Sequence, residues 1–319
     1  MEIKHTILVI CYNQEKFIRQ ALDSVLCEQI KPHEIIIGDD FSTDGTRRIL
    51  KDYKDKYPDI IKLVLNEKNI GIFANLNNIV QWANGDVISF LSGDDWYKPK
   101  FLEKMNAVIS YQNLDPQVTR FLLMPNTVIH HPSGVEISMR NDARLFRRFT
   151  AVGLIFREKF RNQHTGISRA LFQKWPAFES DSELIGPWAD RVHHILFAQY
   201  LDNLVYMDAD GPVYRSGVGV SSRTNHLELE RSFQKALIRL RLYFKENKLR
   251  LNKLDNNYLE FLIAKTGLSL GVNYSSIMIF IHASWVVMRA NVADIPYISR
   301  ETFKVIRRII SKQKNRINN

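Results

Sequence analysis

Short apolar runs alternate with segments of helical periodicity along the first 110 residues. The runs at 6–11, 34–38, 60–65 and 87–91 have the length of strands, and they are apolar at nearly every position, which is typical of strands buried on both faces. Apolar residues recur at helical spacing after the first, third and fourth runs. We therefore expect an α/β fold, with a mostly parallel sheet covered by helices on both faces.

A hairpin is the clearest pattern beyond residue 110. Two β-rich runs, 121–130 and 135–139, flank Pro132-Ser133-Gly134, and such turn residues between two strands predict an antiparallel pair.

Positive charge is concentrated in the last third of the chain. Residues 1–220 hold 26 Lys and Arg against 27 Asp and Glu, whereas residues 221–319 hold 18 against 7. Within this third, apolar residues at helical spacing predict a basic amphipathic helix. They are Phe233, Leu237, Leu240 and Phe244. The helix either packs on the body of the protein with a solvated polar face or docks on anionic lipid headgroups.

The composition is that of a soluble folded protein, with 45% hydrophobic and 24% charged residues in a chain of 319. Cys11 and Cys27 both fall in apolar segments and are expected to be reduced, buried thiols. Charged residues interrupt the first 30 positions, so no signal peptide is indicated and we expect a cytoplasmic protein. Polar residues likewise interrupt segment 268–288, which we interpret as buried helix rather than a membrane span.

Polar residues follow three of the four predicted strands. They are Tyr12-Asn13-Gln14, Asp39-Asp40 and Asp94-Asp95. Because the carboxyl ends of parallel strands meet at one edge of a sheet, we expect both acidic pairs on one rim. A single pair is usually a turn or a helix cap, but two neighbouring pairs repel unless a cation or hydrogen-bond donors offset their charge. Mg²⁺ or Mn²⁺ shares its oxygen ligands between carboxylates and phosphates, so the rim implies a phosphorylated ligand.

Other nucleotide sites are not supported. The chain has no Gly-x-x-x-x-Gly-Lys-Ser/Thr loop, and no Gly-x-Gly-x-x-Gly follows the first predicted strand. Neither a P-loop nucleotide triphosphatase nor a dinucleotide-dependent dehydrogenase is therefore indicated.

Several motifs stand in the order found in one protein family. Residues 7–14 resemble its first strand and Tyr-Asn turn, and residues 34–46 resemble its nucleotide-binding segment. Asn69-Ile70-Gly71 and residues 84–95 resemble the stretch that leads to its acidic metal motif. On these residues the sequence resembles the family 2 glycosyltransferases of the GT-A fold.

The resemblance implies a domain organisation. Residues 1–220 would form the GT-A catalytic domain, with a nucleotide-binding half at 1–110 and an acceptor half at 111–220. Residues 221–319 would add a basic helical region.

The resemblance also implies a reaction: inverting transfer of a sugar, expected to be a hexose, from a nucleotide diphosphate sugar to an acceptor hydroxyl. The donor is expected to be a UDP-sugar and the cofactor Mn²⁺ or Mg²⁺. By position, Asp39 would bind the base, with Asp40 nearby. Asp94 would contact the ribose or the metal, and Asp95 would bind the metal that neutralises the diphosphate leaving group. The other residues of the implied nucleotide site are Tyr12, Asn13, Asn69 and Gly71.

The general base is expected in the acceptor half. Asp190 matches the Asp of the family's Glu-Asp motif, in which Ala189 takes the place of the Glu. An inverting displacement needs such a carboxylate to accept the hydroxyl proton. Asp190 could instead only begin a helix, and Glu183 and Asp181 are the alternative bases.

The expected role is synthesis of a surface polysaccharide, such as O-antigen or capsule, on a lipid-linked or saccharide acceptor. The basic region would hold the enzyme peripherally at the inner membrane face. Two other classes stay open. Ser92, where the commoner metal motif has an acid, and Ala189 suggest a catalytically inactive scaffold. The net charge of +10 suggests a protein that binds an anionic surface or nucleic acid. Nucleic acid is disfavoured, because no nucleic-acid-binding module is recognisable and an acidic rim without metal repels phosphate.

Overall fold

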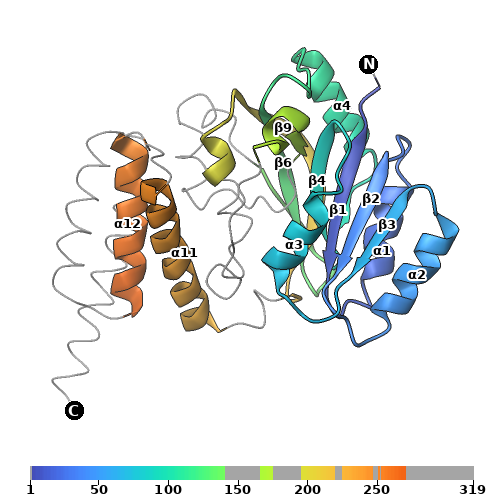
Figure 1. The fold of residues 1–319 in the computed structure, drawn as a ribbon, viewed down its shortest axis with the longest axis horizontal. Coiled ribbons are helices and arrows are strands. Elements are labelled where there is room, and N and C mark those ends of the chain that lie inside the picture. Colours follow the sequence, from blue (N-terminus) through green and yellow to red (C-terminus); the bar gives the residue numbers. More distant parts are fainter. Residues whose placement is uncertain are drawn as a thin grey trace. The chain divides into compact units, whose positions relative to one another are not determined.

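The computed structural model describes residues 2–140, 166–174, 195–219, 225–246, 251 and 253–270. The chain divides into two compact units, Met1–Arg223 and Thr224–Asn319. Figure 1 shows the sheet of the first unit and the helix pair of the second.

The first unit is built on a mixed sheet. Its order is β3-β2-β1-β4-β8-β6-β9-β5, with β7 paired to β6. The strands are β1 (His5–Cys11), β2 (Glu34–Asp39), β3 (Ile61–Leu65), β4 (Val87–Ser92), β5 (Trp96–Tyr97), β6 (Phe121–His130), β7 (Glu136–Met139), β8 (Gly166–Ser168) and β9 (Asn203–Arg215). The four strands predicted for the first 110 residues are confirmed, each end within one residue.

Most strands run in one direction. β1 to β4 are mutually parallel, and β8 is antiparallel to both of its neighbours, β4 and β6. Since β9 is parallel to β6, β6 and β9 run in the direction of β1 to β4. The carboxyl ends of six strands therefore lie at one edge of the sheet.

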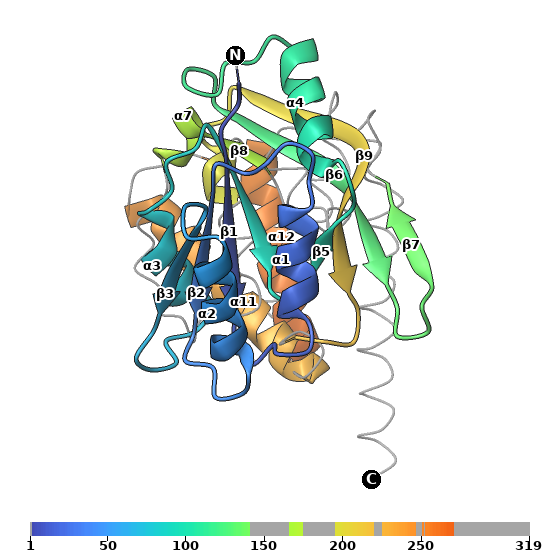
Figure 2. The ribbon, with the colours of Figure 1, turned by 90° about the vertical axis from the view of Figure 1, so that its right-hand side faces the viewer.

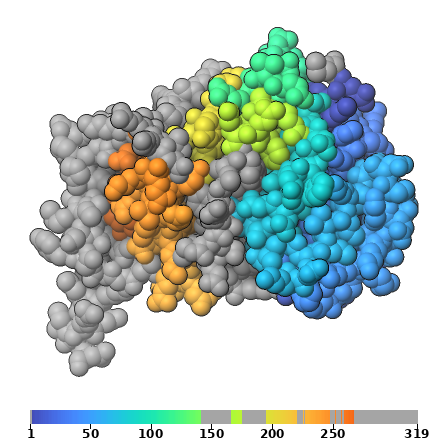
Figure 3. Space-filling view, in the orientation of Figure 1, coloured from blue at the N-terminus to red at the C-terminus, as the bar shows by residue number. Residues whose placement is uncertain are grey.

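Helices cover both faces of this sheet, as predicted. On one face, α1 (Ile18–Leu26), α2 (Thr46–Lys56) and α4 (Phe101–Tyr111) share a core with Ile7 and Val9. On the other, α3 (Ile72–Val80) and α7 (Arg169–Phe172) pack around Leu8. Successive residues of β1 thus enter opposite cores, because side chains alternate along a strand. Figure 2 shows α1 lying along the sheet, and Figure 3 shows α3 in cyan and α7 in yellow-green on the surface of their face.

The predicted hairpin is also confirmed. β6 and β7 are antiparallel, with Thr127 opposite Met139, and Gly134 in the turn has a φ of 82°. This left-handed conformation is readily adopted by glycine because it lacks a Cβ.

The second unit contains the predicted amphipathic helix. It is α11 (His226–Glu246), which packs on α12 (Lys253–Leu270). All four residues of the predicted apolar stripe are buried, and Arg231 and Lys235 are exposed. An ion pair of 3.2 Å between Arg241 and Glu260 joins the two helices. The apolar face that a membrane-docking helix would expose is therefore covered in this structure.

The helices of the described residues include none that combines the length and apolarity needed to cross a bilayer. Of the candidate buried helix 268–288, positions from residue 271 onwards lie outside the described residues.

Candidate active site

Polar segments from three parallel strands meet at the carboxyl edge of the sheet. Cys11, the last residue of β1, lies opposite Asp39, and Ile10 lies opposite Ser92. The segments that follow β1, β2 and β4 therefore begin side by side. This convergence is what the order of strands in the sequence predicted.

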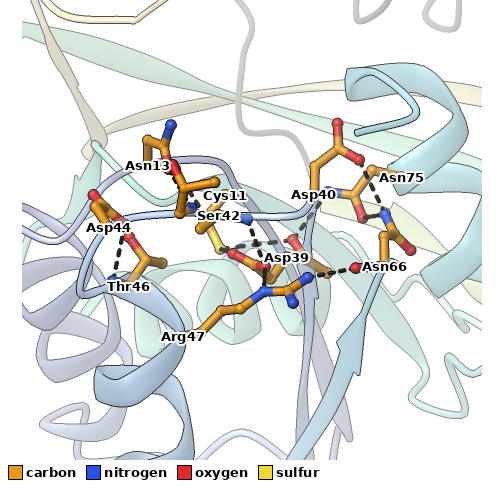
Figure 4. Close-up of polar contacts among 12 residues, drawn as sticks. Cys11, Asn13, Asp39, Asp40, Ser42, Asp44, Thr46, Arg47, Asn66 and Asn75 are labelled. Carbon is orange, nitrogen blue, oxygen red and sulfur yellow. Dashed lines mark hydrogen bonds and ion pairs between the residues drawn. The ribbon is translucent and has the colours of Figure 1, made fainter. Parts of the chain in front are cut away.

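Asp39 is fully buried and bonded within its own segment. Its Oδ2 accepts a hydrogen bond from the Arg47 Nε at 2.6 Å and another from the backbone N–H of Ser42 at 3.0 Å. Arg47 also donates to the backbone carbonyl of Asn66, so it joins the turn after β2 to the loop after β3 (Figure 4). The charge of Asp39 is thus offset by a guanidinium rather than by solvent.

Asp40 organises the loop before α3. Its carboxylate accepts hydrogen bonds from the backbone N–H groups of Ile70 and Gly71, each at 2.8 Å, and from the Asn66 side chain at 3.1 Å. The Asn69 side chain also accepts from Gly71, at 3.2 Å. The predicted nucleotide-site residues Asp40, Asn69 and Gly71 therefore form one connected group.

A buried amide network supports these loops from below. The Asn75 Nδ2 donates to the carbonyl of Gly38 at 2.9 Å, and its Oδ1 accepts from Asn66 at 3.0 Å. A Cβ on Gly38 would lie 2.5 Å from that Oδ1, so only glycine allows α3 to approach β2 this closely. Figure 4 shows this network beside the Asp39–Arg47 pair.

Three residues of this site were not predicted from the sequence: Arg47, Asn66 and Asn75. Arg47 did carry a signal, because it stands in the first turn of α2, where the helix dipole disfavours a positive charge. Such a position suggests an acidic partner nearby.

Aromatic side chains are exposed at the same edge. Tyr12 is 45% exposed and Phe41 is 40% exposed. Phe41 has a φ of 65°, which is unusual for a bulky residue, and the Arg47 guanidinium lies 5.1 Å from its ring centre. Asn13 fixes the turn that carries Tyr12, since its side chain accepts from the N–H of Thr43 at 2.8 Å.

The second acidic pair is almost buried. Asp94 is 8% and Asp95 is 2% exposed. The Asp95 Oδ1 accepts a hydrogen bond from the backbone N–H of Arg215 at 2.8 Å, and the Asp94 carbonyl accepts from the Arg215 Nε at 2.9 Å. A Cβ on Gly219 would lie 2.9 Å from the Asp94 Oδ2, so the backbone after β9 passes close to this carboxylate.

Comparison with known proteins identifies the domain that carries this edge. Residues 6–150 match the family model of glycosyl transferase family 2. The chain contains a family 2 glycosyltransferase domain.

EpsE of Bacillus subtilis, assigned as a glycosyltransferase, is 40% identical over 106 residues, which cover 33% of this chain and 38% of EpsE. TuaG of the same species, assigned to teichuronic acid biosynthesis as a glycosyltransferase, is 40% identical over 114 residues, which cover 35% of this chain and 44% of TuaG. An uncharacterised Mycobacterium tuberculosis protein is 38% identical over 115 residues, 36% of this chain and 33% of that protein. The matches thus span a third to under half of these relatives.

Solved structures show the same GT-A fold. Staphylococcus aureus TarS in complex with UDP superposes with a TM-score of 0.63 at 16% identity, over 98% of this chain and 92% of that one. A Pyrobaculum calidifontis mannosyltransferase in complex with GDP-Man and Mn²⁺ gives a TM-score of 0.53 at 14% identity, over 96% and 88%. The expected fold class is confirmed.

The acidic pair of this glycosyltransferase domain suits a hard divalent cation. Among the residues that the structure describes, no three His, Cys, Asp or Glu side chains gather into a metal cluster. Asp94 and Asp95 nevertheless supply adjacent carboxylate oxygens, and Mg²⁺ commonly takes one or two protein carboxylates and completes its shell with substrate phosphates. The pair therefore fits a cation that binds together with a phosphorylated ligand.

Asp190, the expected general base, lies outside the described residues, as does the neighbouring Ala189. The alternative bases Glu183 and Asp181 also lie outside them.

The prediction for the cysteines was half right. Cys11 is buried, and burial together with the nearby Asp39 raises the pKa of its thiol well above the ordinary value, so the thiol stays protonated. Cys27 is exposed, contrary to expectation. It lies just beyond the last residue of α1 and does not belong to the buried apolar stripe of that helix.

Proposed function

We propose that the chain is a metal-dependent, inverting glycosyltransferase that moves a hexose from a nucleotide diphosphate sugar to an acceptor hydroxyl. The observation that carries the proposal is the position of Asp94 and Asp95, at the end of β4 within a family 2 glycosyltransferase domain. Ligands of open α/β sheets bind at this edge.

The nucleotide would bind where the segments after β1 and β2 meet. The exposed ring of Tyr12 offers an apolar surface for the base. Since Asp39 is buried and bonded to Arg47, it and Asp40 contribute by fixing the loops around the base. A UDP-sugar is the proposed donor, supported by the likeness of the fold to TarS, which was solved with UDP.

The residues would divide the chemistry between donor and acceptor. Asp94 and Asp95 would hold the Mn²⁺ or Mg²⁺, which when bound neutralises charge developing on the diphosphate. On the acceptor side, Asp190 would take the hydroxyl proton as the new bond forms, which gives inversion in a single displacement.

We further propose a place in surface polysaccharide synthesis, with a lipid-linked or saccharide acceptor. The assignment of TuaG to teichuronic acid biosynthesis supports this class of product. The basic last third would keep the enzyme in the cytoplasm at the inner membrane face, near such an acceptor.

Asp95→Asn tests the metal role. The amide has the same shape and still accepts from Arg215, so the fold should persist. We expect UDP with Mn²⁺ to raise the melting temperature of the parent chain, since a ligand stabilises the state it binds. In Asp95→Asn this shift should largely disappear, and hydrolysis of UDP-sugars should fall by about 100-fold.

Asp59→Asn, an exposed carboxylate on the same unit, is the matched control and should behave as the parent. If Asp95→Asn retains full Mn²⁺-dependent binding and turnover, the assignment of Asp95 is wrong. Binding of UDP by the parent without any turnover, on a panel of UDP-, GDP- and dTDP-sugars, would favour the inactive scaffold suggested by Ser92.

A further inference from the structure

Arg215 is held in a closely fitted position beside the acidic pair. Its guanidinium lies 4.7 Å from the ring centre of Phe17 and 4.5 Å from that of Trp96. Its Nε donates to the carbonyl of Asp94 at 2.9 Å, and its terminal NH2 donates to the Gln20 Oε1 at 2.5 Å. The side chain therefore joins the end of β9 to α1 and to the segment after β4.

The backbone of the same residue acts on the acidic pair directly. The N–H of Arg215 donates to the Asp95 Oδ1 at 2.8 Å. One residue thus fixes both the main chain at Asp94 and the carboxylate of Asp95. Both contacts come from the same residue, so the side chain and the backbone of Arg215 hold the end of β9 against the acidic pair together.

The Arg215 side chain has little freedom to serve as a phosphate ligand. Arginine binds a phosphate through a planar fork of donors, but here the Nε and one terminal nitrogen already donate within the protein. The rings of Phe17 and Trp96 both lie within cation–π distance of the guanidinium. This geometry favours an indirect role.

We propose that Arg215 is a positioning residue, which aligns Asp94 and Asp95 for the divalent cation and does not itself bind the nucleotide. The inference rests on the proposed function. It predicts that Arg215 affects only the part of nucleotide binding that depends on the cation. A lysine at this position keeps the positive charge but loses the planar fork and its Nε donor.

The test compares UDP affinity with Mn²⁺ and with EDTA, by isothermal titration calorimetry, for the parent and Arg215→Lys. We expect Mn²⁺ to strengthen UDP binding to the parent. In Arg215→Lys this strengthening should shrink by about tenfold, the usual scale for loss of one charge-assisted hydrogen bond, while the affinity in EDTA stays unchanged.

Arg169→Lys is the matched control. Like Arg215, Arg169 donates from its Nε to a backbone carbonyl, that of Gly85 at 2.8 Å, and its guanidinium lies 5.6 Å from a ring centre, that of Phe172. These contacts lie near the start of β4, whereas the acidic pair follows its end. Arg169→Lys should lower the melting temperature without changing the effect of Mn²⁺ on UDP affinity. If Arg215→Lys does not fold, Phe17→Leu removes one of the two rings and should give a smaller change in the same direction.

Three outcomes would overturn the inference and leave the proposed function standing. Weaker UDP binding in EDTA would show a direct nucleotide contact. If Mn²⁺ strengthens UDP binding to a folded Arg215→Lys as much as to the parent, the side chain does not align the pair. If Arg169→Lys loses this strengthening to the same extent as Arg215→Lys, the loss is a general effect of lower stability. A parent that binds UDP, GDP and dTDP no better with Mn²⁺ would overturn the proposed function itself, and the inference with it.

Discussion

At the scale of single residues, the buried carboxylate of Asp39 needs a partner that offsets its charge. A carboxylate with no exposed surface is costly unless a partner offsets its charge, and Arg47 is that partner at 2.6 Å. Arg47→Met should therefore destabilise the first unit by about 3 kcal/mol, because it leaves a buried charge without its partner. Urea denaturation followed by circular dichroism measures this loss.

Two further variants separate the charge from the packing. Arg48→Met removes the neighbouring guanidinium, which is exposed, and should change the free energy of unfolding by less than about 0.5 kcal/mol. Asp39→Asn added to Arg47→Met removes the unpaired charge and should restore part of the lost stability. If the double variant is no more stable than Arg47→Met, the loss comes from packing and not from the buried carboxylate.

At the scale of elements, the start of α4 depends on a carboxyl group from the segment that follows α1. Glu28, which is 2% exposed, accepts hydrogen bonds from the backbone N–H groups of Phe101 and Leu102 at 3.1 and 3.4 Å. Burial, with the neighbouring Glu103 carboxyl, raises the pKa of Glu28 from 4.5 to about 7. The folded state therefore binds this proton more tightly than the unfolded state does.

The raised pKa of Glu28 makes its contribution to stability fall as the pH rises. Between pH 4.5 and about 7 the folded chain holds more protons than the unfolded chain, so the contribution of Glu28 to stability is complete below pH 4.5 and is lost as the pH rises through 7. Glu28→Gln cannot lose a proton, so its free energy of unfolding should fall less between pH 5 and pH 8 than that of the parent, by about 1–3 kcal/mol. Chemical denaturation at the two pH values tests this, with the exposed Glu67→Gln as control. Equal pH dependence in Glu28→Gln and the parent would contradict it.

The sequence predicted individual elements well, but it did not predict the polar contacts between them. β1 to β4, β6 and β7 were predicted to within one residue because each is a β-rich run next to turn residues, whereas β5 and β9 were not predicted. The parallel order of β1, β2 and β4 alone predicted that both acidic pairs lie at one edge of the sheet. The bond from Glu28 to α4 joins residues 73 positions apart, and Arg47 reaches Asn66 across another loop. Such contacts depend on how helices pack on the sheet, and apolar periodicity carries no information about which polar side chains then meet.

At the scale of the whole molecule, positive charge is concentrated in the last third of the chain. Residues 221–319 hold 18 Lys and Arg against 7 Asp and Glu, whereas the first 220 residues are nearly balanced. Since the apolar stripe of α11 is buried, attraction to a membrane would have to come from charge and not from inserted side chains. Charge alone makes such binding sensitive to salt, because ions screen exposed charges over about 10 Å at 0.1 M.

This chain should therefore bind anionic vesicles in a salt-sensitive way. It should sediment with vesicles that contain phosphatidylglycerol, not with vesicles of phosphatidylcholine alone, and the bound fraction should fall as salt is added. Each basic residue near an anionic surface contributes about 1 kcal/mol, so reversing the exposed charges in Arg231→Glu/Lys235→Glu should weaken binding at least about tenfold. Lys51→Glu/Lys56→Glu makes the same change in net charge on the exposed surface of α2. If this second pair weakens binding as much as the first, net charge alone drives association, and the basic last third has no special part in it.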